Sequence, residues 1–332
     1  MSRYTAVHAN TKGPGDARPI ALQIIKDEGL EEKRQGQIFV ITGTSSGIGI
    51  ETVRAIAATG ATLYLTARNL DKAKTALDGI FDPSRMELFQ MDQGSLTSVR
   101  AAATAILKKT SKIHCLIANA GIMAIPDLRF TADGHELQFG TNHLSHFLFF
   151  QLLKPALLAA ASPELPSRVV VLSSSGHNIQ GINDADNYAF EHGDYEPNLA
   201  YAQSKTANIY MANEIERRYG AKHLHATSVH PGVVATGLTR HMPPDAFKGM
   251  EHIYPMMKSV EQGAATTVWA AVGEAWKHNG GKYLVDCDAA KPTVDGDDKM
   301  IGPGYAPHAY DVQKAARLWK DSLKLVGLED EE

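Results

Sequence analysis

The sequence predicts an α/β fold of one domain, built on a doubly wound parallel sheet with helices on both faces. Two observations carry this prediction. Short runs of β-branched and apolar residues alternate with helix-like segments from residue 38 onward, and no repeat, low-complexity tract or linker interrupts the alternation. Strands that are apolar throughout are buried on both faces, as in a parallel sheet covered by helices. With 332 residues, 44% of them hydrophobic, the chain is long enough to bury such a core.

The predicted elements follow one another in strand–helix order. The first strand, residues 38–41, ends at a glycine-rich turn that leads into a helix at 50–59, which Gly60 stops. β-branched and apolar runs predict the later strands, and apolar residues at helical spacing predict the later helices. These strands are 62–66, 86–91, 113–118, 168–172 and 224–229, and these helices are 70–77, 96–107, 147–158 and 201–219.

Four segments lie outside this alternation: the N-terminal extension 1–37, a polar insert 176–199, a Met- and Pro-rich segment 237–259 and a C-terminal tail at about 292–332. Long irregular segments in compact domains are commonly functional or disordered. We predict that the Met- and Pro-rich segment forms an adaptable apolar lid over a substrate, with internal packing or an interface as the alternative. In the extension, Ala21, Ile24 and Ile25 predict a short helix lying on the core, with a mobile segment as the alternative.

Composition narrows the function class and the compartment. The net charge is −4 with both signs interspersed, which argues against nucleic-acid binding through a basic face. Cys115 and Cys287 are too few for a disulfide framework, so we expect two small buried side chains in a reducing compartment. Residues 1–34 are polar and lack the apolar run of a secretory signal. The most apolar stretch, 147–161, is interrupted and shorter than the roughly 18 residues that span a bilayer, so we expect a cytoplasmic protein without a membrane span.

The turn after the first strand has the composition of a site for a dinucleotide diphosphate. It reads Thr42-Gly43-Thr44-Ser45-Ser46-Gly47-Ile48-Gly49. Glycines let the backbone approach a diphosphate closely, and the N-terminus of the following helix faces the negative charge. The spacing is T-G-x-x-x-G-x-G rather than G-x-G-x-x-G, and an ordinary glycine turn is the alternative. The predicted cofactor contacts here are Gly43, Ser45, Ser46, Gly47, Ile48 and Gly49.

Three other strand ends carry candidate cofactor contacts. Asp92 and Gln93 follow the third strand, where a carboxylate can accept a hydrogen bond from an adenine amino group. Asn119-Ala120-Gly121 closes the fourth strand beside the expected nicotinamide. After the second strand, where an acidic residue binds the ribose 2′-hydroxyl of NAD, the chain has Arg68. A planar guanidinium suits a 2′-phosphate, so we predict NADP(H) in preference to NAD(H); a plain surface charge is the alternative.

Tyr201 and Lys205 begin a strongly helical stretch and form the candidate catalytic pair. Their i, i+4 spacing puts the phenol and the ammonium on one face of the helix. A free tyrosine titrates near pH 10, roughly three units too high for acid–base work at neutral pH, and we expect the lysine cation and an oxidised nicotinamide to lower that pKa. Ser174, preceded by Ser173, follows the fifth strand, a position from which a hydroxyl can hold a substrate carbonyl beside the tyrosine. We therefore predict that Ser174 and Tyr201 both contact the substrate. Asn142 starts an apolar helix and can hold a water against Lys205.

Three histidines, His143, His146 and His177, lie near these motifs. Their spacing is not that of a metal site, so we predict no metal and assign them capping or packing roles. His177 is also a candidate substrate contact. Met242 and Tyr254, from the Met- and Pro-rich segment, are the other candidate substrate contacts.

Taken together, the motifs resemble the short-chain dehydrogenase/reductase family, whose domain is a Rossmann fold. The segments that occur in the family's order are Thr42 to Gly49, Asn119 to Gly121, Asn142, Ser174, Tyr201, Lys205 and His230-Pro231-Gly232 through Thr236. The resemblance implies a catalytic tetrad of Asn142, Ser174, Tyr201 and Lys205. It also implies a nicotinamide pocket shaped by Pro231, Gly232 and Thr236, with Val234 a further cofactor contact.

The resemblance extends to the retinol-dehydrogenase-like branch of the family and spans nearly all of residues 38 to 328. Its further marks are the long insert before Tyr201, Ser259 to Ala264, Gly281 to Cys287, and Leu318-Trp319. Membrane members of this branch carry an apolar N-terminal anchor, which this sequence does not show, so the resemblance does not extend to retinoid specificity. The helices at 147–161 and 201–219 resemble those that pair subunits in the family, which implies a homodimer.

The resulting hypothesis is an NADPH-dependent reduction of a hydrophobic aldehyde or ketone to an alcohol. Tyr201 protonates the developing alkoxide, Lys205 binds the ribose hydroxyls, and Ser174 holds the carbonyl oxygen, while the hydride chemistry belongs to the cofactor. One alternative is the reverse reaction, an NADP-dependent alcohol oxidation. Another is a non-catalytic NADP(H)-binding sensor or scaffold, against which the four catalytic groups argue. A sugar-nucleotide epimerase or dehydratase shares the tyrosine and lysine, but its glycine spacing and large C-terminal domain differ.

Overall fold

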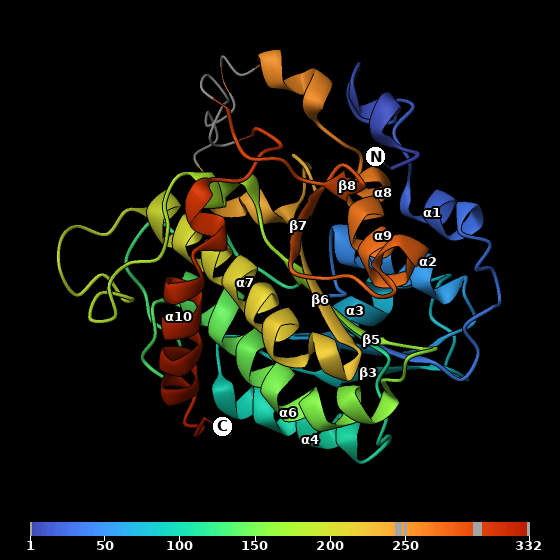
Figure 1. Ribbon diagram of the computed structural model, residues 1–332, viewed down its shortest axis with the longest axis horizontal. Helices are drawn as coiled ribbons and strands as arrows, with labels where there is room; N and C mark the ends of the chain where they lie inside the picture. Colours follow the sequence, from blue (N-terminus) through green and yellow to red (C-terminus); the bar gives the residue numbers. More distant parts are fainter. Residues whose placement is uncertain (1, 243–247, 249–250, 295–300, 331–332) are drawn as a thin grey trace.

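The computed structural model describes residues 2–242, 248, 251–294 and 301–330 and has one large sheet at its centre (Figure 1). Its strands are β1 Ile38–Thr42, β2 Thr62–Ala67, β3 Met86–Gln90, β4 Cys115–Ala118, β5 Ser167–Leu172, β6 Leu224–His230, β7 Lys282–Val285 and β8 Asp288–Ala289. They lie in the order β3-β2-β1-β4-β5-β6-β7-β8, and only the β7–β8 pair is antiparallel. The order reverses between β1 and β4, and folds of this kind bind ligands beyond the carboxyl ends of the strands at such a point. The predicted doubly wound parallel sheet is confirmed.

Ten α-helical segments of the described residues connect and cover the strands. They are α1 Ala21–Asp27, α2 Ile48–Ala57, α3 Leu70–Ala76, α4 Leu96–Leu107, α5 Leu137–Phe139, α6 Ser145–Ala160, α7 Pro197–Tyr219, α8 Val260–Gly263, α9 Ala265–Val272 and α10 Val312–Leu325. Ser95 and Asp311 cap the first turns of α4 and α10 with their side chains. The helix predicted at 201–219 begins earlier, at Pro197, because the Glu196 carboxylate caps its first turn and proline suits that position.

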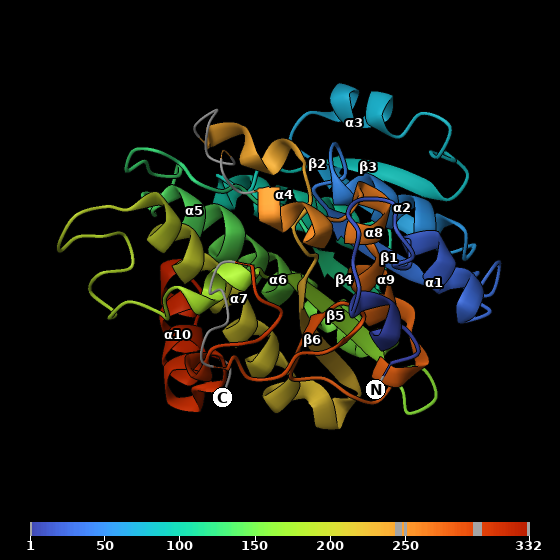
Figure 2. The same ribbon diagram turned by 90° about the horizontal axis from the view of Figure 1, so that it is seen from above.

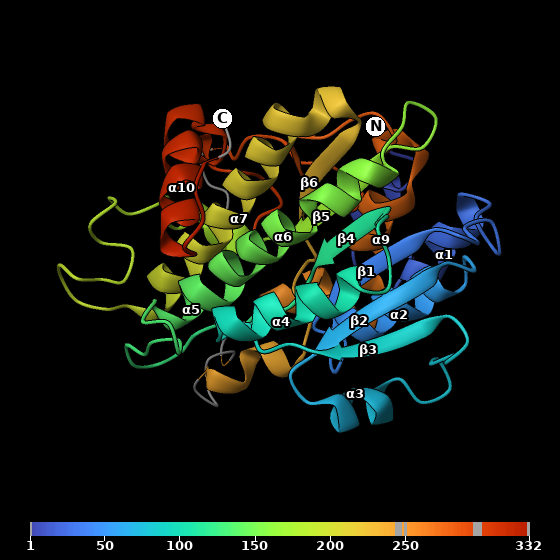
Figure 3. The ribbon, with the colours of Figure 1, turned by 90° about the horizontal axis from the view of Figure 1, so that it is seen from below.

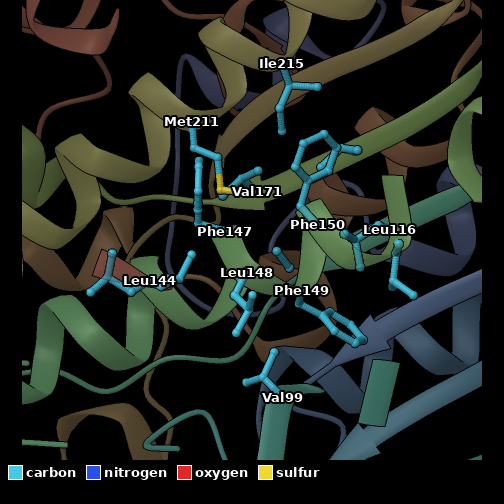
Figure 4. Packing of buried hydrophobic residues seen from close by; sticks show 14 of the residues in the cluster. Val99, Leu116, Leu144, Phe147, Leu148, Phe149, Phe150, Val171, Met211 and Ile215 are labelled. Carbon is cyan, nitrogen blue, oxygen red and sulfur yellow. The ribbon is translucent and has the colours of Figure 1, made fainter. Parts of the chain in front are cut away.

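Two layers of helices cover the sheet, and each encloses its own apolar core (Figures 2 and 3). α4, α6, α7 and α10 lie on one face, and α1, α2 and α9 lie on the other. Neighbouring residues of β1 face opposite ways, so that Val40 packs in the first core while Phe39 and Ile41 pack in the second. Figure 4 shows part of the first core, where Phe147 of α6 and Met211 of α7 lie close together. Both faces of the sheet are therefore buried, as its uninterrupted apolar strands predict.

The C-terminal tail contains a helix, α10, which the sequence analysis did not predict. It lies along α7 in Figures 1 and 3. The Trp319 ring stands edge-on to Phe147 with ring centroids 4.9 Å apart, and the Arg218 guanidinium carbon lies 4.7 Å from the Trp319 ring centroid. α10 thus covers part of α6 and α7, the two helices on which the expectation of a homodimer rested, with side chains of the same chain.

The N-terminal extension lies on the core. α1 packs against α9 and α2, and Ala21, Ile24 and Ile25 are buried in the second core. The first of the two alternatives for this extension, a short helix on the core, is therefore confirmed.

The predicted lid at 237–259 contains two turns of 3-10 helix, η5 Gly237–His241 and η6 Glu251–Met256. Residues 243–247 and 249–250 of the lid lie outside the described part of the chain. None of the helices in the described ranges is long and apolar enough to cross a membrane.

Candidate active site

The turn between β1 and α2 is built from three glycines that no other residue can replace without strain. A Cβ on Gly43 would lie 2.7 Å from the Ala120 Cα, and a Cβ on Gly49 would lie 2.3 Å from the Gly43 carbonyl oxygen. Gly47 has a φ of +61°, in the left-handed region that favours glycine. No side chain caps the N-terminus of α2, so its first backbone N–H groups remain available to an anion. The turn has the form of a diphosphate cradle.

A hydrogen-bond network joins this turn to the end of β4. The Thr42 hydroxyl oxygen accepts hydrogen bonds from the backbone N–H groups of Asn119 and Ala120, at 2.9 and 3.0 Å. It also lies 2.9 Å from His146 Nε2, and because its acceptor positions are taken, the hydroxyl donates to that nitrogen. The Asn119 side chain donates to the Thr42 carbonyl oxygen at 2.8 Å. These hydrogen bonds fix the end of β1 against the end of β4, the two strands between which the strand order reverses.

Several polar atoms around the crevice fit a dinucleotide. The Asn119 Oδ1 and Gln93 Nε2 atoms are buried and have no hydrogen-bond partner among the described residues. Asp92 Oδ1 accepts from the Gly94 backbone at 2.9 Å, which holds the carboxylate at the end of β3. Arg68 is exposed at the end of β2, and no ion pair within the described ranges involves its side chain. The cradle and these atoms suit a dinucleotide, whose polar groups would satisfy the buried amides.

The loop after β6 forms the opposite side of the crevice. Gly232 has a φ of +93°, and Thr236 caps η5 by accepting a hydrogen bond from the Leu238 backbone. A Cβ on Gly47 would lie 3.5 Å from Thr236, so the loop that begins at Pro231 and the phosphate turn face each other closely. The structure thus brings the cofactor residues predicted from β1, β4 and β6 to one place.

The four predicted tetrad residues also lie together. A Cβ on Gly121 would lie 3.2 Å from Asn142 Oδ1 and 3.6 Å from Lys205 Nζ. Lys205 Nζ lies 5.5 Å from the centroid of the Tyr201 ring and donates to the Leu172 carbonyl oxygen at 3.1 Å. Tyr201 and Lys205 are both buried. A phenol, an ammonium and an amide thus meet at the carboxyl end of the sheet.

Ser174 lies against the tyrosine, at the end of β5. Its hydroxyl oxygen accepts from the Gly176 backbone at 3.1 Å. A Cβ on Gly176 would lie 3.3 Å from the Tyr201 ring, so that ring packs directly on the turn. Ser173, by contrast, is buried and donates to the Lys205 carbonyl oxygen at 2.8 Å, which gives it a purely structural contact.

Burial shifts the pKa of both members of the catalytic pair. Burial raises the pKa of Tyr201 to about 12, although hydrogen bonding with Ser174 acts in the opposite direction. Burial lowers the pKa of Lys205 to about 8. In the protein alone, desolvation of the phenolate outweighs the favourable contacts. The lowering of the tyrosine pKa by the lysine cation together with an oxidised nicotinamide stays a prediction.

Asn142 is tied to its surroundings by its side chain. It lies in η2, a π-helical turn at Gly140–Leu144 that leads into α6; such turns are frequent at functional sites. Its amide nitrogen donates to the Ile122 carbonyl and the Ser204 hydroxyl oxygens, and its amide oxygen accepts from the Ile122 backbone, each at 2.9 Å. Both N–H donors of the side-chain amide are therefore used, whereas its oxygen, which has two lone pairs, keeps one acceptor position for a water beside Lys205.

The histidines near these motifs are buried and neutral. His146 Nδ1 donates to the Asn142 carbonyl oxygen at 3.0 Å, and His143 Nε2 lies 2.9 Å from the Ser322 hydroxyl. Burial lowers the pKa of His146 to about 4 and that of His143 to about 3. Both are packing and capping residues, as the sequence predicts.

A large cavity lies between the loop after β6 and the described end of the predicted lid. Its volume is about 600 Å³, and it is lined by Val233, Val234, Ala235, Thr239, Glu251, Ile253, Tyr254 and Met257. Tyr254 was predicted as a substrate contact and lies in this lining. Sequence reasoning did not single out Val233, Ala235, Thr239 or Glu251, because no local pattern distinguishes them.

Two predicted substrate contacts lie elsewhere. His177 is fully buried: its Nδ1 lies 2.6 Å from the Ser174 carbonyl oxygen, and its Nε2 accepts from the Ala306 backbone. Burial lowers its pKa to about 4. His177 therefore supports the turn at Ser174 and is not among the residues that line the cavity, and its role as a substrate contact stays a prediction. Met242 ends η5 and is not among the residues that line the cavity.

The fold and the site define a dinucleotide-binding oxidoreductase, and comparisons with known proteins agree. The family model described as short chain dehydrogenase matches residues 37–189. The short-chain dehydrogenase/reductase prx1 of Penicillium roqueforti is 46% identical over 331 residues, which cover 99% of this chain and 96% of that protein. Retinol dehydrogenase 11 of Mus musculus is 33% identical over 88% of this chain and 87% of that protein. The crystal structure of an uncharacterised protein from Mycobacterium paratuberculosis has a TM-score of 0.68 and 32% identity, covering 89% of this chain and 95% of that one.

The chain therefore belongs to the short-chain dehydrogenase/reductase family. Within that family it is similar to the retinol dehydrogenases, as the long insert before Tyr201 and the C-terminal motifs indicated. It is an oxidoreductase of a family that binds nicotinamide cofactors.

Proposed function

We propose that the protein uses NADPH to reduce a hydrophobic aldehyde or ketone to an alcohol, with Tyr201 as the general acid. The observation that carries this proposal is the meeting of Tyr201, Lys205, Ser174 and Asn142 at the carboxyl end of the sheet, next to the crevice that suits a dinucleotide. An apolar cavity adjoins the same crevice through Val234. When bound, the nicotinamide supplies the hydride.

Tyr201 carries the proton that the reduction consumes. With its pKa raised to about 12, the phenol is protonated at neutral pH. It can therefore donate that proton to the alkoxide that develops on the substrate oxygen. The Lys205 ammonium, 5.5 Å from the ring centroid, stabilises the phenolate that remains, and its field is strong because the site is buried.

Ser174 orients the carbonyl oxygen. Its hydroxyl oxygen already accepts from the Gly176 backbone, so its own O–H is the group left to donate. Its backbone is held by His177, whose Nδ1 lies 2.6 Å from the Ser174 carbonyl oxygen. A fixed donor of this kind stabilises negative charge as it forms on the substrate oxygen.

Arg68 supports the preference for NADPH over NADH. It stands at the end of β2, where the ribose of a dinucleotide lies in folds of this type. Its exposed guanidinium has no carboxylate partner among the ion pairs of the described residues. A free guanidinium at this position suits the 2′-phosphate of NADP(H).

The cavity supports a hydrophobic substrate. Six of its eight lining side chains are apolar or aromatic, and Thr239 and Glu251 are the polar ones. Its volume of about 600 Å³ falls within the range of small-molecule sites. Apolar walls with few polar groups favour an aliphatic or aromatic carbonyl over a sugar or an amino acid.

We also propose a cytoplasmic location. Cys115 and Cys287 are both buried and free, and burial raises the pKa of each thiol to about 12. Thiols of this kind are inert, and a chain without a disulfide framework suits a reducing compartment. Cell fractionation with compartment markers tests this location, and recovery with secreted or lumenal proteins would contradict it.

The direct test of the activity is the absorbance of NADPH in the near ultraviolet, followed with purified protein and a panel of aliphatic and aromatic aldehydes and ketones. We expect NADPH oxidation with hydrophobic carbonyls, and much slower oxidation of NADH. Measurable NADPH binding with no turnover across the panel would instead favour a non-catalytic sensor. Turnover with alcohols and NADP, but not with carbonyls, would favour the oxidative direction.

A further inference from the structure

We propose that the N-terminal segment Gly13–Arg18 is part of the substrate site, and that Arg18 is a positioning residue that holds the cavity wall formed by residues 253–257. The inference rests on the proposed function, because it assigns the substrate to the cavity that this wall encloses. It predicts that the segment controls which carbonyl compounds bind and has little influence on NADPH.

Arg18 is buried, and its guanidinium is surrounded by acceptors from two parts of the chain. Nη1 donates to the Met256 carbonyl oxygen at 2.8 Å, and Nη2 donates to the carbonyl oxygens of Met257 and Pro255. Nε donates to Asp16 Oδ1 at 2.8 Å, which balances the charge. A planar guanidinium has five N–H donors in a fixed fork and can satisfy such a set, whereas a lysine ammonium cannot match its geometry.

The three carbonyl groups that Arg18 holds are those at the end of η6. The last carbonyls of a helical turn have no partner within the helix, and a basic side chain is one means of capping them. Arg18 provides this cap from a position 238 residues away in the sequence. Without it, the carbonyl groups of Met256 and Met257 would lose this donor, and the wall would have to shift to find another donor or water.

A second set of contacts holds the same segment. The Gly13 backbone donates to the Pro255 carbonyl oxygen, and the Gly15 backbone donates to Gln262 Oε1, each at 3.0 Å. Gln262 in turn donates to the Asp16 carbonyl oxygen at 3.1 Å. A Cβ on Gly13 would lie 2.6 Å from the Tyr254 ring, so the segment packs directly against that side chain. In Figure 1 the blue N-terminal segment lies beside the orange segment that leads into α8.

The wall held by Arg18 faces the cavity. Ile253, Tyr254 and Met257 line it, together with Val233 and Val234 of the loop after β6. Directly after the wall, the Lys258 backbone donates to the Val233 carbonyl oxygen at 2.8 Å. Arg18 therefore acts next to the point where the wall joins the loop after β6, and it sets the distance across which a substrate must fit.

The relatives show that this segment is not peculiar to one chain. The match with the Penicillium roqueforti protein covers 99% of the present chain and therefore reaches into the extension, whereas the family model begins at residue 37. Residues 13–18 thus lie outside the segment that the family model matches.

The test compares Arg18→Gln with a matched variant, Arg3→Gln. Arg3 lies in the same extension and is exposed, and its side chain donates to the Asp27 carbonyl oxygen within the described part of the chain. We expect Arg18→Gln to raise KM for a bulky hydrophobic carbonyl about tenfold, the effect of losing roughly one buried hydrogen bond. We expect kcat and the Kd for NADPH to change by less than about twofold in the same variant. Arg3→Gln is expected to leave all three values unchanged. Arg18→Lys, which keeps the positive charge, is expected to raise KM less than Arg18→Gln does.

Hydrogen–deuterium exchange of the peptide 251–258 provides a readout that needs no turnover. We expect faster exchange there in Arg18→Gln and no change in the peptides of β1 and α2. Unchanged KM and unchanged exchange would overturn the proposal. Equal losses in kcat, NADPH binding and thermal stability would also overturn it, since they would show a general structural role. If the wild-type protein reduces no carbonyl compound while exchange still responds, the proposed function fails and the contact between Arg18 and the wall stands.

Discussion

The cofactor side and the substrate side of the crevice are built in different ways. The cofactor side consists of strand ends of one sheet, and short hydrogen bonds join them, as where the Thr42 hydroxyl oxygen accepts from the backbone N–H groups of Asn119 and Ala120. The proposed substrate side is assembled from the loop after β6 and the wall at 253–257, and Arg18, far away in the chain, holds that wall. The difference suggests that the first side sets the reaction, while the second sets the substrate.

Two buried cations show the same contrast. Among the described residues, the Lys205 side chain has one hydrogen bond, to the Leu172 carbonyl oxygen, and burial lowers its pKa to about 8. Arg18 has several carbonyl acceptors and the Asp16 carboxylate. A buried charge with few partners destabilises the fold more than one with a full set of partners. The reaction side therefore carries the larger cost in stability.

The largest expected effect tests the reaction side. Tyr201→Phe removes the proton donor but keeps the ring that packs on Gly176. We expect kcat to fall about 10³-fold, within the range for loss of a general acid. Steady-state kinetics measures this, and NADPH titration should give a Kd within about twofold of the wild type. Near-normal turnover would contradict the assignment of Tyr201.

Arg68→Asp tests the cofactor preference on the same side. Replacing a cation by a carboxylate removes the partner of the 2′-phosphate and adds repulsion. We expect kcat/KM with NADPH to fall about 10- to 100-fold, the range for losing a charged hydrogen bond, while the value with NADH is unchanged or higher. Lys72→Asp, at another exposed position after β2, is the control and should leave the ratio of kcat/KM with NADPH to kcat/KM with NADH unchanged. A preference unaffected by Arg68→Asp would show that this residue is a plain surface charge.

Lys205→Met tests the cost of the buried cation. Because the lysine pKa is lowered from 10.5 to about 8, the folded protein binds fewer protons than the unfolded chain between these values, and stability rises with pH across that window. The cost is fully present below pH 8, where it amounts to about 3 kcal/mol. We therefore expect Lys205→Met to stabilise the fold at pH 7 but not above pH 10.5. Denaturant unfolding at both pH values measures this, and equal effects at the two would contradict it.

The smallest expected effect tests the substrate side. Met257→Ala enlarges the cavity and should change KM for hydrophobic carbonyls about tenfold, raising it for small ones and lowering it for bulky ones. We expect kcat of this variant to stay within about threefold of the wild-type value. A loss of kcat as large as that of Tyr201→Phe would remove the distinction between the two sides.

Much of the fold was predictable from local patterns. The strands from β1 to β6 lie within a few residues of the predicted ranges, because β-branched runs and glycine turns are properties of neighbouring residues. The later elements α9, β7 and α10 were not predicted. In α10, for example, Leu318 and Trp319 form an apolar face that is buried against α7, and α7 lies about 100 residues earlier in the chain.

The candidate site divides along the same line. The glycine turn, the strand-end residues and the Tyr201–Lys205 pair follow from sequence, because glycine conformation and helical spacing are local. Whether Tyr201 has a raised or lowered pKa, how the Asn142 side chain is used, and where His177 faces depend on burial, which the tertiary structure decides.

The sequence by itself determined the doubly wound sheet and pointed to the chemistry at its carboxyl end, since both are encoded in short motifs whose backbone geometry is locally restricted. Only the tertiary structure decided what encloses the cavity. Arg18 contributes to that wall because its guanidinium reaches carbonyl groups 238 residues away, and no periodicity or spacing connects residues at such a distance.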